Sequence, residues 1–189
     1  RASPDEDPSK FIENLSKLIN LLKSANPPLN FNETHPTTKK TPLESCISTN
    51  NGLVIKSLLQ EIYDLKITDN AWAMASQLKD SGIALTILAN MLNRANKFYS
   101  SNKITDADNL YNLAFENLNI LSNYRASLND AEHQAENLNL NLNQQKIDQE
   151  LFQVKYKLMM AIIRCRRRMN DLSYAEKLCD QLIDLTPNQ

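Results

Sequence analysis

Apolar residues recur at helical spacing along most of this chain. Between residues 105 and 121 they form a single face: Ala107, Leu110, Tyr111, Ala114, Leu118 and Leu121. Steps of three and four residues are typical of an amphipathic helix rather than a strand. The chain has only 2 Gly and 6% aromatic residues, whereas sheets favour aromatic and β-branched positions joined by Gly-rich turns. We therefore predict an all-α fold.

Helix start and stop signals divide this pattern into separate segments. The first helix begins at Asp7-Pro8 and ends before Pro27-Pro28, because proline is tolerated in the first turn but not inside a helix. Further helices are predicted at 53–65, from an N-cap at Asp69 to a break at Asp80-Ser81-Gly82, and at 83–100, 105–121 and 147–169, with a last one before Pro187. Two of them begin with the spacing of a capping box, Thr105 with Asp108 and Ser173 with Glu176.

The segment between Pro27-Pro28 and Asn50-Asn51-Gly52 is rich in Pro, Thr and Asn and has no sustained periodicity. So long an irregular stretch is unusual inside a compact domain. We therefore predict a flexible N-terminal part, residues 1–52, made of one helix and a mobile linker. The remaining residues, 53–189, are predicted to form a domain of antiparallel helical hairpins.

The segment 123–145 carries conflicting signals. Leucine alternates with asparagine from Asn137 to Asn143, and period two is typical of a strand. The surrounding Ala, Glu and Gln residues favour a helix, and no second strand is available for pairing. We predict a polar helical extension or an irregular connector.

Two helical hairpins, each made of a helix, a short turn and a second helix, cover residues 91–119 and 159–187. They align with an offset of 68 residues. The alignment places Ala107 on Ala175, Tyr111 on Cys179 and Ala114 on Leu182. The offset is twice a 34-residue period, and this spacing resembles the tetratricopeptide repeat, a helix pair in which small residues permit close packing. The resemblance covers about 60 residues of the chain and implies an array of hairpins whose inner surface accepts a partner peptide.

The two units match the repeat pattern to different degrees. The first has acceptable residues at six of eight signature positions, namely Met91, Ala95, Phe98, Ala107, Tyr111 and Ala114, and departs at Arg94 and Asn119. The second keeps Met159, Ile162, Ala175 and Pro187, tolerates Cys179, and departs at Ile163, Arg166 and Leu182. Ile163 matters most, because it replaces a small residue at the close contact. The 34 residues between the units show no match.

A second resemblance is to the microtubule-interacting-and-trafficking modules, which are three-helix bundles and would occur here singly or in tandem. Residues 83–124 followed by a third long helix would suit that family as well. Its members bind amphipathic helices of vesicle-sorting or autophagy partners. Both resemblances imply a surface between helices that accepts a peptide or helix of another protein.

The sequence Arg164-Cys165-Arg166-Arg167-Arg168 is the most conspicuous charged feature. In the repeat resemblance, the inner face of the second unit comprises Lys157, Met160, Arg164, Arg167 and Arg168, and that of the first includes Leu92, Asn96 and Tyr99. Arginine binds carboxylates through charge-assisted, partly bidentate hydrogen bonds. We therefore predict a site for a peptide with an acidic end and a hydrophobic body.

Two alternatives remain for the same arginines. Cations near a helix C-terminus also complement the helix dipole without binding any ligand. Nucleic-acid binding is a weaker alternative, because the formal net charge is -1 and aromatic residues for base stacking are scarce.

No motif in the sequence points to an enzyme. His35 and His133 lie far apart and have no Cys or Ser partner at motif spacing, so we predict no catalytic residue, metal or cofactor. No segment approaches the ~20 apolar residues of a membrane span. Cys46, Cys165 and Cys179 lack disulfide-framework spacing, which favours an intracellular location, cytoplasmic or nuclear. The predicted function is a protein–protein interaction scaffold or adaptor, as a subunit of a larger complex.

Overall fold

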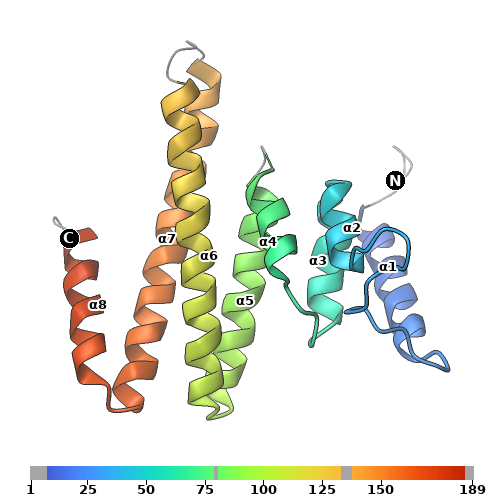
Figure 1. The fold of residues 1–189 in the computed structure, drawn as a ribbon, viewed down its shortest axis with the longest axis horizontal. Helices are drawn as coiled ribbons and strands as arrows, with labels where there is room; N and C mark the ends of the chain where they lie inside the picture. Colours follow the sequence, from blue (N-terminus) through green and yellow to red (C-terminus); the bar gives the residue numbers. More distant parts are fainter. Residues whose placement is uncertain (1–7, 79–80, 133–137, 186–189) are drawn as a thin grey trace. The chain divides into compact units, whose positions relative to one another are not determined.

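The computed structural model describes residues 8–78, 81–132 and 138–185 of the chain. These residues form eight α-helices and no strand (Figure 1), which confirms the all-α prediction. Their contacts divide the chain into two compact units, residues 1–86 and 87–189. Each unit is described by itself below.

The first unit contains α1 (Pro8–Lys23), α2 (Pro42–Ser48), α3 (Gly52–Glu61) and α4 (Asp69–Ser76). Helix α3 packs against α1 and α2, and α2 also packs against α4. Fully or almost fully buried side chains from several of these segments fill the interior: Leu43, Ile47, Ile55, Leu65, Ala71, Trp72 and Ala75.

Helix α2 lies within the segment that we predicted as a mobile linker. It begins with a capping box, in which Glu44 N–H donates to the Thr41 hydroxyl (3.2 Å) and Thr41 N–H donates to the Glu44 carboxylate (2.9 Å). Leu43 and Ile47 are fully buried. The unit boundary thus lies after residue 86 rather than at the predicted residue 52. A helix of 7 residues has too few turns to show a periodic pattern in the sequence.

Glu44 also connects α2 to α4. The Thr68 hydroxyl donates to Glu44 Oε1 (2.6 Å) and accepts from Ala71 N–H, which makes Thr68, rather than the predicted Asp69, the N-cap of α4. Burial alone would raise the pKa of Glu44, but the hydrogen bonds from Thr68 and Thr41 outweigh it and lower the pKa below its usual value.

The second unit contains the part of α5 (Gly82–Ser100) from residue 87, followed by α6 (Ile104–Glu132), α7 (Leu138–Arg168) and α8 (Leu172–Leu185). Helix α7 packs against both α6 and α8 (Figure 1). The ambiguous segment 123–145 is helical wherever it is described, up to Glu132 and again from Leu138. Residues 133–137, including His133, lie outside the described residues.

Asparagine ends three helices in this chain. Asn50, Asn102 and Asn170 follow α2, α5 and α7 with φ angles of 51°, 61° and 62°. At each site the asparagine N–H and the next N–H bond back to carbonyls of the preceding helical turn, the pattern of a Schellman motif. Asparagine tolerates the left-handed conformation better than most residues. It thus takes the role of glycine in a chain with 2 Gly.

Small residues lie in the interior of the second unit. Ala95, Ala107 and Ala114 are fully buried beside larger side chains, which include Met91, Tyr111, Leu118, Leu121, Leu158, Met159 and Ile162. Alanine brings helix backbones close together without leaving a cavity. The pairs Met91/Met159 and Ala107/Ala175, which align in the predicted repeat, are buried at both positions.

Candidate interaction site

The arginines at the end of α7 point to different sides of the helix. Arg164, Arg167 and Arg168 are exposed, and Arg166 is half-buried. Residues three and four apart share a helix face, so the three exposed arginines lie together. We call these three residues the arginine face.

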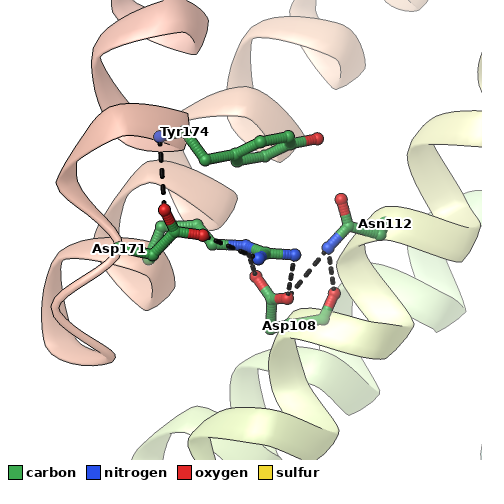
Figure 2. Close-up of polar contacts among 5 residues, drawn as sticks. Asp108, Asn112, Asp171 and Tyr174 are labelled. Atoms are coloured by element: carbon green, nitrogen blue, oxygen red, sulfur yellow. Dashed lines mark hydrogen bonds and ion pairs between the residues drawn. The ribbon is translucent and has the colours of Figure 1, made fainter.

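Arg166 is held by two carboxylates of the same unit. Its Nη2 lies 2.7 Å from Asp108 Oδ2, its Nε lies 3.1 Å from Asp108 Oδ1, and its Nη1 lies 3.0 Å from Asp171 Oδ2 (Figure 2). The Asn112 amide donates to the same Asp108 carboxylate (3.1 Å). The Arg166 guanidinium also lies 4.5 Å from the centre of the Tyr174 ring. Arg166 therefore connects α6, the end of α7 and the start of α8.

We call Arg166, Asp108 and Asp171 the ion network. Its two aspartates have roles that differ from our predictions. Tyr174 N–H donates to Asp171 Oδ1 (3.3 Å), so Asp171 caps α8 instead of the predicted Ser173. Asp108 pairs with Arg166 instead of capping α6 with Thr105. Burial raises the pKa of Asp108, and the charge of Arg166 opposes that rise. Arg166 and Asp108 are 58 residues apart, so no local sequence signal pairs them.

Arg168 lies against the turn between α5 and α6. Its Nη2 donates to Asn102 Oδ1 (2.9 Å), and its guanidinium carbon lies 5.0 Å from the centre of the Tyr99 ring. Both distances fit direct interactions, a hydrogen bond and a cation–π contact. The structure thus brings together two predicted site residues, Tyr99 and Arg168, from different helices.

The other predicted site residues are less closely connected. Arg164 Nε donates to the Met160 carbonyl of its own helix (3.2 Å), while Lys157 is exposed and Leu92 is half-buried. Within the described ranges, the side chains of Lys157 and Leu92 make no hydrogen bond or ion pair with the other site residues. Asn96 is exposed.

Asn96 also has a structural role. Its Oδ1 accepts a hydrogen bond of 2.6 Å from the Tyr111 hydroxyl, which joins α5 to α6. Burial raises the pKa of Tyr111 to about 12, although the positive charge of Arg164 opposes the rise. Asn96, Tyr111 and Arg164 are therefore near neighbours, and the phenol stays protonated at neutral pH.

The arginine face is not neutralised by carboxylates of the described residues. In the second unit, Arg166 pairs with Asp108 and Asp171. No described carboxylate lies within ion-pair distance of Arg164, Arg167 or Arg168. Their positive charge is therefore available to an anionic ligand.

The described residues provide little chemistry of other kinds. Over residues 8–78, 81–132 and 138–185, no group of three or more His, Cys, Asp or Glu could hold a metal ion. Burial raises the pKa of the Cys165 thiol to about 11 and also raises that of Cys46, so neither forms much thiolate at neutral pH. His35 Nδ1 accepts from the backbone N–H groups of Thr37 and Thr38. No described helix is apolar over a length sufficient to span a bilayer.

No family model, curated protein or solved structure matches this chain.

Proposed function

We propose that this chain is a protein–protein interaction scaffold or adaptor that binds a partner peptide at the arginine face. The observation that carries the proposal is the contrast between neighbouring arginines of α7. Arg166 is compensated within the fold, whereas Arg164, Arg167 and Arg168 have no described carboxylate partner. A cluster of such arginines is typical of surfaces that bind acidic motifs.

The proposed ligand is a peptide with an acidic end and a hydrophobic body. Its carboxylates would bind the arginine face through charge-assisted hydrogen bonds. Half-buried Leu92, Tyr99 and Met160 would provide apolar contact area beside the charged groups. Such a module would act within a larger complex, inside the cell, with no catalytic step of its own.

The tetratricopeptide-like arrangement is the favoured architecture for this function. Two features support it: the short α5–α6 and α7–α8 turns end in Asn102 and Asn170, and these residues repeat the 68-residue offset of the aligned units. The alternative three-helix trafficking module does not account for α8, which packs on α7 and is tied to it by Arg166 and Asp171.

Charge reversal tests the proposed site. The variant R164E/R168E is compared with K146E/K177E, which makes the same charge change at two exposed lysines of the second unit. The probe is a fluorescent peptide of glutamates followed by leucines, and binding is measured by anisotropy. We expect the arginine variant to bind about tenfold more weakly or worse, and the lysine variant to bind as the wild type does.

Several outcomes would count against this proposal. If R164E/R168E binds the peptide as tightly as the wild type does, and its far-ultraviolet circular dichroism is unchanged, the arginine face is not the binding site. Affinity that depends on the leucines but hardly on salt would favour the trafficking-type module. Tighter binding of a single-stranded oligonucleotide than of the peptide, with a steep salt dependence, would favour a nucleic-acid ligand.

A further inference from the structure

The three arginines of the face differ in how firmly they are held. Arg168 has two contacts outside its own helix, with the Asn102 amide (2.9 Å) and the Tyr99 ring (5.0 Å). The Arg164 side chain donates a hydrogen bond to the Met160 carbonyl of its own helix. The Arg167 side chain has no hydrogen bond, ion pair or ring contact with the residues that the structure describes.

A restrained arginine binds an anion at a lower entropic cost than a mobile one. Ordering a long side chain at an interface is unfavourable, and a side chain that is already ordered avoids part of that cost. The Asn102 bond uses one of the five N–H donors of the guanidinium, so most of its donors remain for a carboxylate. Tyr99 and Asn102 are neutral and do not compete as counter-ions.

We propose that Arg168 is the principal carboxylate-binding residue of the arginine face, and that Tyr99 and Asn102 are its positioning residues. This inference rests on the proposed function and assigns unequal roles within the same site. Asn102 lies at the left-handed end of α5, with a φ of 61°, and its amide oxygen accepts the hydrogen bond from Arg168 there. The turn between α5 and α6 thus reverses the chain and also orients the Arg168 guanidinium.

The test uses the full chain, a labelled oligo-glutamate peptide as the probe and a set of matched variants. We expect R168A to weaken binding about tenfold and R167A, in the same helical turn, to weaken it less than threefold. Y99L removes the ring and should approach the R168A value, while Y99F keeps the ring and should restore wild-type affinity. N102G keeps the left-handed turn but removes the amide acceptor, so it should weaken binding moderately.

The outcomes separate this inference from the proposed function. Equal losses in R167A and R168A, or equal affinities of Y99L and Y99F, would overturn the assigned roles while the face remained a binding site. Absence of binding by the wild-type chain would contradict the proposed function and this inference with it. Tyr99 is half-buried, so Y99L could be unstable. N102G lies in an exposed turn and tests the positioning of Arg168 without changing the Tyr99 ring. Wild-type affinity in N102G would overturn the positioning role.

Discussion

At the scale of single residues, Asp108 has the most demanding environment in the second unit. Its side chain is 4% exposed, and a buried carboxylate is costly unless cations and hydrogen-bond donors compensate it. Arg166 and Asn112 supply that compensation. The stability of the contact between α6 and α7 should therefore depend on Arg166 more than on any exposed arginine nearby.

Replacing Arg166 by methionine should lower the free energy of unfolding by about 2–3 kcal/mol, because Asp108 would lose its charged partner. The double variant D108N/R166M should be less destabilised than the sum of the single variants, since neither charge remains. Urea unfolding followed by far-ultraviolet circular dichroism measures both. The control is R164M, at an exposed position, and an equal loss in that variant would contradict the role of the ion network.

Glu44 should give the first unit a pH-dependent stability. The pKa of Glu44 is lowered from 4.5 in the folded chain, so its contribution is complete above that value and is lost as the pH falls through the folded pKa. The variant E44Q should be destabilised by about 1–2 kcal/mol at pH 7, because Thr68 and Thr41 donate to different carboxylate oxygens and the amide NH2 group, which cannot accept, would replace one of them. The difference from wild type should shrink below about pH 4.5. If the difference in free energy of unfolding between E44Q and wild type, measured in urea titrations, is the same at pH 7 and below about pH 4.5, this explanation is wrong.

The sequence predicted the residues of the arginine face but not their separate roles. Helical spacing was enough to place Arg164, Arg167 and Arg168 on one face. The distinction between Arg166 and its neighbours depends on Asp108 and Asp171, and that between Arg168 and Arg167 depends on Tyr99 and Asn102. Most of these partners are distant in the sequence, so spacing alone could not identify them.

At the scale of secondary-structure elements, the ends of helices were the least predictable features. Capping side chains were expected at Asp69 and Ser173, but the structure uses Thr68 and Asp171. In each case a second residue with a suitable side chain lies one or two positions earlier, and the choice depends on where the chain must leave the preceding turn. Asparagine is common in turns, but the Schellman geometry that Asn102 and Asn170 share is visible only in the backbone.

Helix α2 supports a direct test of the difference between a linker and a packed element. Ile47 is fully buried in the segment predicted to be mobile. Replacing it by alanine should lower the stability of the first unit by about 2–4 kcal/mol, the usual cost of truncating a buried aliphatic side chain. The exposed position Ser48 is the control, as S48A. Equal stabilities of I47A, S48A and wild type in urea would indicate that the segment does not pack.

At the scale of the whole molecule, the division into two units predicts two unfolding events. Each unit has its own buried core, and the chain has 1 Trp, Trp72 in α4. Tryptophan fluorescence should therefore follow the first unit, while circular dichroism follows both. In I47A the fluorescence transition should shift to a lower urea concentration. In R166M the fluorescence transition should stay in place, and only the part of the circular dichroism transition that comes from the second unit should shift. Coincident transitions in every variant would show that the two units unfold as one.

Sequence patterns alone identified this chain as helical and located the central parts of its long helices, because helical periodicity depends on residues close together in the chain. The ends of α6 and α7 that lie within residues 123–145 stayed ambiguous. The sequence also indicated the face on which the exposed arginines gather. Only the tertiary structure decided that residues 42–48 form a buried helix, where the chain divides, and which arginine is neutralised. These features depend on contacts between residues far apart in the chain, such as Glu44 with Thr68 and Arg166 with Asp108, which a linear pattern does not record.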